Sequence, residues 1–563
     1  MALKDVTLDV ITTEIIRNGL VAITREMNKT LVRTAFNPLL YEIKDFGVGL
    51  TDRDGNLWAE APAVTVFLGC LSDTVKNGLT KFGHDGFAPG DVIIANDPFT
   101  TGTHISDTSV YVPIFAGDEL VGFAITTAHW ADIGGKTPGG WCPDSTDVYQ
   151  EGMCFTHLKL ERAGVPDETL YEFILSNVRF PVVVRGDLSA QLAACRQGRI
   201  GLEKLCQKYG ANAVARGMKL VAERTASTMR ERIRELPDGT YAAESYLDYD
   251  GVTKDVSPLI RVSITVAGDA LEVDFKGSSP TTRGPVNIPF IGSKSAVRAA
   301  LKGVLYPRDE TNYGHFDAIV CIEYKGLITS PQRPGPTDSY GYAACAIMNL
   351  VSRAMHGVVP ERCSADAYQL FGCYLYRVDE RDGKPFIFIE PIDGGHGARP
   401  HHDGPTLIFW ADGDTPNMPV EVLETRFPIR CEQSALIHEA GGPGKFRGGA
   451  AVRREFRVLE DGIYLQTIIE GTKDPARGLA GGEQAHGGVI IVRPGTQQEE
   501  MFQSRLSFYG PLSKNELVRV QSGGGGGLGP PTERDPELVK ADLVNGTMTP
   551  ESAHSVYGFR EGD

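Results

Sequence analysis

The chain has 563 residues, and its 72 Asp and Glu residues outnumber its 56 Lys and Arg residues, which gives a formal net charge of −16. This acidic balance argues against a nucleic-acid-binding protein, because contact with a phosphate backbone needs a basic surface. Hydrophobic residues at 41% and charged residues at 23% exclude wholesale disorder, and at roughly 150 residues per domain the length predicts about three or four domains.

The first predicted element is a long amphipathic helix from residue 12 to about residue 35, with Thr12 or Thr13 as its N-cap. Its apolar residues recur at steps of three and four: Ile16, Leu20, Ile23, Met27 and Leu31. Strand-like segments follow at residues 46–50, 91–95, 109–115 and 120–127. We therefore predict an N-terminal α/β domain over residues 1–187.

The next segments are helical and then mixed. A helical pattern broken near Tyr209-Gly210 predicts a helix pair over residues 188–236. A mixed α/β domain is predicted over residues 237–430. Its expected elements are a β-hairpin made by residues 260–266 and 270–275, and short helices at 293–305 and 343–355.

The last part of the chain is predicted to be rich in strands. From Glu421 onward, strand-like pieces alternate with glycine-rich turns, and the tail carries Gly523–Gly527 before a short helical piece at 536–543. We assign residues 431–563 to a β-rich C-terminal domain with a glycine-rich tail. The whole chain is therefore predicted to be a mixed α+β, multidomain protein.

The sequence also indicates a compartment. The start Met1–Asp5 has no basic segment followed by an apolar core, and no apolar run reaches about 18 residues, so we expect neither a secretory signal nor a membrane span. The ten cysteines are scattered without a C-x-x-C pair, which argues against a zinc knuckle and a disulfide framework. We expect a cytoplasmic protein.

Two glycine-rich segments imitate nucleotide-binding loops. Gly134-Gly135-Lys136-Thr137 ends like a Walker A loop, but the first glycine of that motif falls on Trp130. Gly524-x-Gly526-x-x-Gly529 has the letters of a dinucleotide fingerprint, but Pro530-Pro531 stands where the helix should begin. We interpret the second segment as a loop that passes close to another backbone, and we expect that this chain does not bind ATP.

Two His-x-x-Asp pairs, His104/Asp107 and His129/Asp132, lie within 29 residues, each beside a glycine turn. Imidazole combined with carboxylate suits Mn, Fe, Zn or Co, whereas Mg and Ca sites are normally all oxygen. A helical turn lets His104 and Asp107 reach one ion, His129 can join from the next strand, and Asp45 is a candidate fourth ligand. The alternative is that the histidines form local hydrogen bonds and the aspartates form turns.

A second group of histidines lies in the loop at residues 394–404. His396, His401 and His402 form the densest histidine cluster of the chain. Two interpretations stay open. The cluster makes a second metal or substrate site, or it belongs to an exposed functional loop without a metal.

Several motifs resemble one known family, the hydantoinase B/oxoprolinase family, which is the beta-type subunit of ATP-dependent hydantoinases, lactamases and acetone or acetophenone carboxylases. The similarity spans nearly the whole chain. Its motifs are Asn96-Asp97-Pro98, Gly102-Thr103-His104-x-x-Asp107, His129-x-x-Asp132-Ile133-Gly134-Gly135, Thr137-Pro138-Gly139, Tyr149-Gln150-Glu151-Gly152, residues 277–287, Pro419 to Glu424, residues 441–449 and the closing glycine-rich tail.

The resemblance implies a division of labour between two subunits. A hydantoinase A-like partner binds ATP and phosphorylates the substrate oxygen, and the beta-type subunit completes the reaction at a divalent metal, which we expect to be Mn, Zn or Fe. By this likeness Asp45, His104, Asp107 and His129 are the metal ligands. Asp132 is expected to orient a ligating imidazole, and Asp132 and His129 are the catalytic candidates.

Three functions follow as hypotheses. The first is a subunit of a heteromeric enzyme that opens a cyclic amide ring after the partner has phosphorylated the substrate. The second is a subunit of an ATP-dependent ketone carboxylase of the acetone or acetophenone type, which bicarbonate dependence would distinguish. The third is a scaffold that organises the ATPase partner without metal chemistry of its own.

Overall fold

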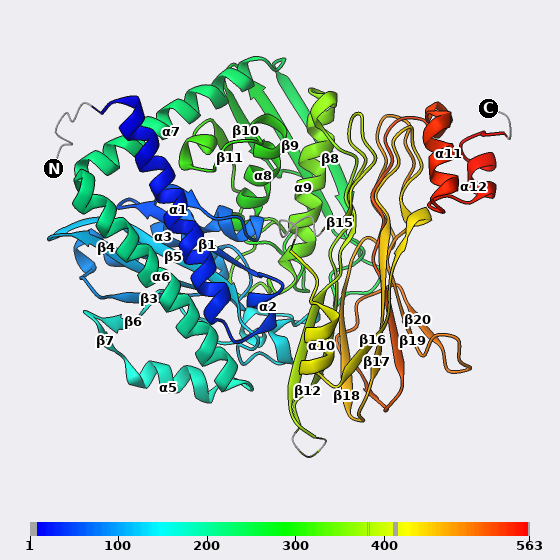
Figure 1. The fold of residues 1–563 in the computed structure, drawn as a ribbon, viewed down its shortest axis with the longest axis horizontal. Helices are drawn as coiled ribbons and strands as arrows, with labels where there is room; N and C mark the ends of the chain where they lie inside the picture. The colour runs from blue at the N-terminus through cyan, green and yellow to red at the C-terminus, as the bar shows by residue number, and fades with distance from the viewer. Residues whose placement is uncertain (1–7, 380, 382, 409–414, 561–563) are drawn as a thin grey trace. The chain divides into compact units, whose positions relative to one another are not determined.

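The computed structural model describes residues 8–379, 381, 383–408 and 415–560 (Figure 1). Residues 1–5, where we expect no secretory signal, lie outside the described residues. The backbone groups into two compact units. Unit 1 comprises Met1–Thr240, Ile264–Phe275 and Pro285–Tyr340, and unit 2 comprises Tyr241–Ser263, Lys276–Gly284 and Gly341–Asp563. Helices and strands occur in both units, which confirms the mixed α+β prediction.

Unit 1 is built on a seven-stranded sheet of order β2-β1-β5-β4-β3-β6-β7, in which every neighbouring pair is antiparallel. Its strands are β1 (Phe46–Asp52), β2 (Leu57–Glu60), β3 (Val92–Ala95), β4 (Asp107–Ala116), β5 (Glu119–His129), β6 (Leu158–Arg162) and β7 (Val165–Pro166). The four predicted strand segments correspond to β1, β3, β4 and β5. The long β4–β5 hairpin carries two of the predicted metal ligands at its open end.

Three long helices of unit 1 confirm the predicted helical segments: α1 (Val10–Thr34), α6 (Pro181–Tyr209) and α7 (Ala211–Arg234). The prediction of Thr12 or Thr13 as the N-cap of α1 is wrong. Asp9 is the cap, because its carboxylate accepts a hydrogen bond from the Thr12 backbone N–H at the open helix end. Gly210 separates α6 from α7 with a φ of 86°, which a residue with a Cβ adopts only with strain.

The sheet of unit 1 is covered on both faces. Alternate residues of β4, such as Val110 and Val112, belong to the core cluster that includes residues of α1 and α6, which cross the sheet in Figure 1. Tyr111, between them, belongs to a second cluster with Leu71 and Val75 of α3 (Thr65–Phe82). This is the side-chain alternation expected of a strand between two layers of helices.

Helix α3 was not among the predicted elements, and it packs against α8 (Phe290–Leu305). Its sequence begins with β-branched residues and contains Gly69 and Gly78, which disfavour a helix locally. The remaining elements of unit 1 are short: α2 (Pro38–Tyr41), α4 (Pro98–Thr101), α5 (Glu168–Ser176), β10 (Ala270–Asp274) and β11 (Ile319–Cys321), the last two paired in parallel.

The chain passes from one unit to the other within β8 (Gly239–Tyr246), β9 (Leu259–Ala267) and α9 (Tyr340–His356). The predicted hairpin strands correspond to β9 and β10, and the predicted helices at 293–305 and 343–355 correspond to α8 and α9. The hairpin and both helices are therefore confirmed.

Unit 2 contains a sheet of order β13-β12-β18-β21 and a sheet of order β16-β17-β22-β19-β20. The strands are β12 (Phe371–Arg377), β13 (Phe386–Pro391), β14 (Gly394–Gly395), β15 (Thr406–Ile408), β16 (Ile429–Ile437), β17 (Ala451–Val458), β18 (Ile463–Ile469), β19 (Val489–Val492), β20 (Glu500–Phe502), β21 (Tyr509–Leu512) and β22 (Leu517–Gln521). The predicted helical piece near the C-terminus is α11 (Pro536–Val544), and α12 (Pro550–Ser555) follows.

One prediction for this region is wrong. The residues directly after Glu421 are not strand-like but belong to a short helix, α10 (Val420–Arg426), because a turn that starts after Pro419 buries Leu423. Strand propensity of Val420 and Val422 is overridden by that burial.

The glycine-rich tail of unit 2 runs between other backbone segments. A Cβ atom at Gly525 would lie 2.0 Å from the carbonyl oxygen of His396, and one at Gly527 would lie 2.0 Å from that of Pro443. Only glycine permits such a close approach. The expectation that this loop passes close to another backbone is confirmed. Among the described helices, none is long and apolar enough to cross a membrane.

Candidate metal centre

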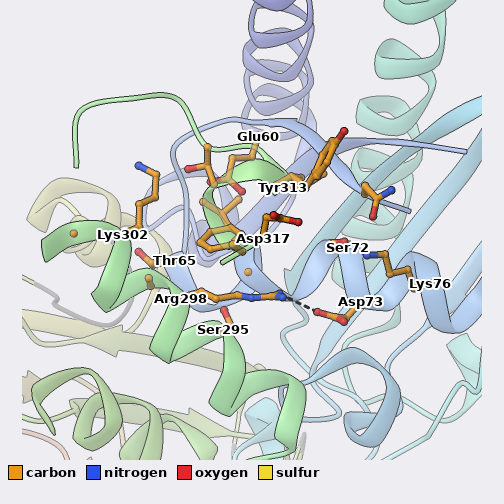
Figure 2. A pocket seen from close by; sticks show the side chains of 18 of the residues that line it. Glu60, Thr65, Ser72, Asp73, Lys76, Ser295, Arg298, Lys302, Tyr313 and Asp317 are labelled. Atoms are coloured by element: carbon orange, nitrogen blue, oxygen red, sulfur yellow. Dashed lines mark hydrogen bonds and ion pairs between the residues drawn. The ribbon is translucent and has the colours of Figure 1, made fainter. Parts of the chain in front are cut away.

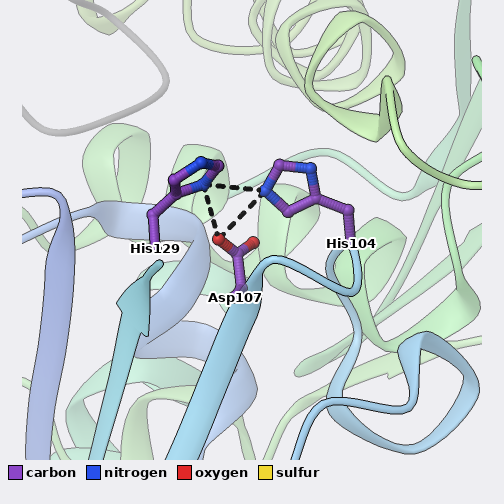
Figure 3. A group of neighbouring side chains, drawn as sticks. All are labelled: His104, Asp107 and His129. Carbon is purple, nitrogen blue, oxygen red and sulfur yellow. Dashed lines mark hydrogen bonds and ion pairs between the residues drawn. The ribbon is translucent and has the colours of Figure 1, made fainter. Parts of the chain in front are cut away.

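Three side chains meet at one end of the sheet of unit 1 (Figure 3). Asp107 is the first residue of β4 and His129 is the last residue of β5, and the antiparallel register places them directly opposite each other. His104 lies three residues before Asp107, in the turn that follows α4 and begins with Gly102 in the left-handed conformation, φ 98°. Local geometry therefore brings together residues 25 positions apart.

The three side chains form a tight and buried cluster. The distance from His104 Nε2 to Asp107 Oδ1 is 3.0 Å, from His104 Nε2 to His129 Nδ1 3.1 Å, and from His129 Nδ1 to Asp107 Oδ1 3.2 Å. The exposed fractions of the side chains are 4%, 0% and 6% for His104, Asp107 and His129. Two ring nitrogens and one carboxylate oxygen thus point at one another (Figure 3).

The outer nitrogen of each ring contacts a backbone carbonyl. His104 Nδ1 lies 2.8 Å from the carbonyl oxygen of Asp338, and His129 Nε2 lies 3.4 Å from that of Gly139. A carbonyl oxygen only accepts, so the single proton of each neutral imidazole lies on this outer nitrogen. The inner nitrogens are then bare. Three lone pairs that face one another without water require a cation between them.

The spacing also fits a metal ion. With bonds of about 2.1 Å and angles of about 90–109°, neighbouring ligand atoms of one ion lie about 3.0–3.4 Å apart, and the measured separations of 3.0, 3.1 and 3.2 Å fall in this range. Two imidazoles and one carboxylate on one face of an ion leave positions open for other ligands. These residues therefore fit a divalent transition metal.

The electrostatics of the cluster favour positive charge beside Asp107. Burial acts to raise the pKa of Asp107, but the adjacent imidazoles His104 and His129 hold it at about 2. Burial acts to lower the pKa of His104, yet the charge of Asp107 outweighs it and the pKa is raised. The carboxylate is therefore ionised, as a metal ligand must be.

Asp45 lies next to the cluster. It immediately precedes β1, its backbone carbonyl accepts a hydrogen bond from the His129 backbone N–H at 3.2 Å, and its charge contributes to the raised pKa of His104. Among the described residues, the ligand atoms within 4.8 Å of one another belong to His104, Asp107 and His129, and those of Asp45 are not in that group. The role of Asp45 as a fourth ligand stays a prediction.

Asp132 has a different partner from the expected imidazole. Its carboxylate is buried and accepts hydrogen bonds from the backbone N–H of Arg179 at 2.5 Å and from Arg179 Nη1 at 2.8 Å. The orienting contacts to the imidazoles come instead from the carbonyls of Asp338 and Gly139. Arg179 lies 47 residues from Asp132, and nothing in the local sequence marks the pair.

Further groups support the cluster from a distant part of the chain. The hydroxyl of Tyr340 donates a hydrogen bond to Asp107 Oδ2 at 3.3 Å. The rings of Tyr340 and Trp141 pack edge-on against His104, with centroid distances of 5.2 and 5.7 Å. Sequence reasoning missed Asp338 and Tyr340, because they stand at the start of a predicted helix and look like ordinary capping residues there.

Glu151 holds the segment that carries Asp338. Its Oε1 accepts hydrogen bonds from the backbone N–H groups of Thr337 and Asp338 at 2.8 and 3.0 Å and from the Ser145 hydroxyl at 2.7 Å. Burial raises the pKa of Glu151 to about 7 despite these donors. The motif Tyr149 to Gly152 thus contributes a residue that positions the carbonyl contact to His104.

The second histidine cluster is divided by burial. His396 is buried and its Nδ1 contacts the carbonyl of Gly397 at 3.0 Å, whereas His401 and His402 are exposed. The described groups of three or more potential metal ligands consist of His104, Asp107 and His129. The geometry therefore gives the hypothesis of a second metal site no support.

Comparison with known proteins places this geometry in context. A family model described as hydantoinase B/oxoprolinase matches residues 9–531. A D-/L-hydantoinase component of the B type from Pseudomonas sp. (strain NS671) is 31% identical over 570 residues, which cover 98% of this chain and 95% of that protein.

Two solved structures have a similar fold. An ATP-dependent caprolactamase from Pseudomonas jessenii superposes with a TM-score of 0.88 at 26% identity, covering 99% of this chain and 98% of that one. The nucleotide-free structure of an acetone carboxylase superposes with a TM-score of 0.89 at 18% identity, covering 97% of this chain and 79% of that one. At 18% identity the second likeness concerns the fold alone.

Proposed function

Because the chain belongs to the hydantoinase B/oxoprolinase family, we propose that it is the metal-dependent subunit of an ATP-dependent enzyme that opens a cyclic amide ring. Hydantoin and caprolactam, named in the relatives, and the oxoproline of the family name are all cyclic amides. The hydantoinase component is 31% identical and the caprolactamase 26%, against 18% for the acetone carboxylase. This order favours hydrolysis over carboxylation.

One observation carries the metal dependence: two imidazole nitrogens made bare by outer carbonyl contacts face one ionised carboxylate at 3.0–3.2 Å. His104, Asp107 and His129 would hold Mn, Zn or Fe, with Asp45 as the proposed fourth ligand. When bound, such an ion supplies Lewis acidity toward an oxygen of the substrate or of water.

The roles of the surrounding residues follow from their contacts. The carbonyls of Asp338 and Gly139 keep the imidazole nitrogens turned inward, and the Tyr340 hydroxyl fixes the second oxygen of Asp107. Asp132 acts only by position, since its pair with Arg179 anchors the loop after β5. Burial of the cluster excludes bulk water and strengthens each electrostatic contact.

The need for ATP follows from the substrate class. A cyclic amide is resonance-stabilised and poorly electrophilic, and phosphorylation of its oxygen creates a good leaving group. The glycine segment that imitates a Walker loop is occupied by other contacts: Lys136 pairs with Asp144 at 2.8 Å, and the Gly135 carbonyl accepts a hydrogen bond from Arg179. We therefore assign ATP binding and phosphorylation to a hydantoinase A-like partner subunit.

The metal content of the purified chain tests this function. We expect a stoichiometric transition metal in the wild type, loss of the metal and of turnover in His104→Ala, His129→Ala and Asp107→Ala, and unchanged assembly with the partner. His402→Ala, which changes an exposed histidine, serves as the matched control and should keep both. Wild-type metal content in both His104→Ala and His129→Ala would contradict the proposal.

A product assay separates the alternatives. The chain and its partner are incubated with ATP and a panel of cyclic amides and ketones, with and without bicarbonate. Ring-opened products that form without bicarbonate are expected. Carboxylated products that require bicarbonate would indicate the ketone carboxylase, and intact activity of Asp107→Ala in a metal-free complex would indicate a scaffold.

A further inference from the structure

A cavity of about 420 Å³ lies between α3 and α8 in unit 1, and it contains none of the three clustered metal-site residues (Figure 2). Its wall includes Ser72, Asp73 and Lys76 of α3 and Arg298 and Lys302 of α8. In Figure 2, Arg298 lies between Lys302 on one side and Lys76 on the other. The volume is within the range of sites for small organic molecules, about 300–1,000 Å³.

Cations are concentrated along one face of α8. Lys294, Arg298 and Lys302 follow each other at steps of four residues, which places like charges next to each other at a cost in helix stability. Asp73 neutralises two of them, since its carboxylate lies 2.7 Å from Lys294 Nζ and 3.4 Å from Arg298 Nη1. The ammonium group of Lys302 donates to the backbone carbonyl of Asp309 at 2.9 Å, a partner without charge.

The opposite wall adds a further cation. Lys76 makes no hydrogen bond or ion pair within the described part of the chain. Two acidic groups also line the cavity, but neither cancels this surplus. Asp317 pairs with Arg230 at 2.8 Å, and burial raises the pKa of Glu60 to about 7, so this carboxyl is largely protonated near neutral pH. An acidic protein thus carries a local excess of positive charge.

The guanidinium of Arg298 has an unused donor. Its Nε–H is buried and has no hydrogen-bond partner among the described residues, and its carbon lies 5.2 Å from the centre of the Phe316 ring. A buried donor without an acceptor is costly unless a ligand or water supplies one. Because a guanidinium edge matches the two oxygens of a phosphate or carboxylate, the missing acceptor is an oxyanion.

We propose that this cavity binds a small organic dianion that carries phosphate or carboxylate groups. Arg298 anchors the anionic group, Lys76 and Lys302 contribute the flanking positive charge, and Leu57, Leu68 and Phe316 pack against the carbon skeleton of the ligand. The proposal concerns a site separate from the metal centre and does not rest on the proposed reaction.

Lysine acetylation read out by mass spectrometry tests the site in the full chain. Partial burial lowers the pKa of Lys76 and Lys302, which favours their reactive amine form. Inorganic phosphate and malonate are the probes, with chloride at equal ionic strength as the reference. At three times the dissociation constant, occupancy should slow the acetylation of both lysines about fourfold. Lys204, an exposed residue of α6, should be unaffected.

Protection by phosphate alone identifies a phosphate ligand, by malonate alone a dicarboxylate, and by both a general dianion site; each supports the proposal. Protection by neither probe overturns it. Arg298→Gln should abolish the protection, and Lys76→Gln, which breaks no ion pair, should weaken the protection of Lys302. Full protection in a folded Arg298→Gln or in Lys76→Gln overturns the proposal. His104→Ala should keep the protection, and its loss there would place the anion at the metal centre instead.

Discussion

The orientation of two imidazole rings decides whether His104, Asp107 and His129 form a ligand set or an ordinary hydrogen-bonded cluster. Each outer ring nitrogen lies near a backbone carbonyl, so each inner nitrogen is bare and faces Asp107. If the outer contacts were missing, an inner N–H could donate to the carboxylate and no cation would be needed. At the scale of single residues, the carbonyls of Asp338 and Gly139 are therefore as important as the ligands themselves.

Tyr340→Phe removes the hydroxyl that donates to Asp107 Oδ2 at 3.3 Å and keeps the ring that packs against His104. We expect metal affinity to fall about 10- to 100-fold, the usual effect of losing a group that orients a ligand. Competition with a chelator of known affinity measures this change. Tyr149→Phe, at a residue that is 69% exposed, is the control, and equal affinity in both variants would refute the role of Tyr340.

His157 provides a residue-scale prediction of pH dependence. It is buried, its Nδ1 lies 3.0 Å from the Tyr111 hydroxyl, and burial lowers its pKa to about 4. Between pH 4 and the ordinary value of about 6.5 the unfolded chain binds a proton that the folded chain does not bind, so stability falls on acidification, by up to about 3 kcal/mol. His157→Gln should flatten the free energy of unfolding in this window. Parallel pH curves for both proteins would contradict this assignment.

At the scale of elements, the β4–β5 hairpin is the part that positions the site. Its register places Asp107 opposite His129, and the turn after α4 supplies His104 from the same end of the sheet. A slip of one residue would turn one of these side chains to the other face of the sheet. The two-sided core that fixes Val110 and Tyr111 therefore also fixes the metal ligands.

The glycine-rich strand of unit 2 gives an element-scale prediction with an internal control. A methyl group at Gly525 would lie 2.0 Å from a backbone carbonyl, which cannot move aside, whereas at Gly523 the nearest atom would be 3.3 Å away. We expect Gly525→Ala to lower the free energy of unfolding by about 3 kcal/mol or more and Gly523→Ala by about 1 kcal/mol. Urea unfolding measures both, and similar losses would argue against close backbone packing.

At the scale of the whole molecule, the metal centre belongs to one compact unit. His104, Asp107 and His129 and the supporting groups from Gly139, Asp338 and Tyr340 all lie in unit 1, although the last two stand more than 200 residues after His104. Unit 2 has its own sheets and glycine-rich core. The division of the chain into four domains ending at residues 187, 236, 430 and 563 stays a prediction.

The isolated chain should hydrolyse no ATP, because neither glycine-rich segment forms a phosphate-binding loop: Lys136 is paired with Asp144, and Gly524 to Gly527 lie against other backbones. Release of phosphate should appear only when the hydantoinase A-like partner is added. A phosphate-release assay on the purified chain, with and without the partner, checks this. Measurable ATP hydrolysis by the chain alone would place the nucleotide site here after all.

The sequence by itself determined the elements whose pattern is local. Apolar steps of three and four residues located α1 and the α6–α7 pair, and strand-like composition located the β4–β5 hairpin, because burial of one face imposes that period on the sequence. The same short range covers His104 and Asp107, which are three residues apart on one turn. The motifs around them were also sufficient to indicate the family.

Tertiary structure decided what depends on partners far along the chain. Asp132 pairs with Arg179 and not with an imidazole, Asp338 and Tyr340 complete the metal centre, and α3 forms through packing on α8 despite its glycines. Hydrogen-bond partners and cavity walls are selected by close packing between segments distant in sequence. A local pattern therefore identifies which residues can bind a metal, but only the folded chain fixes which of their atoms face the ion.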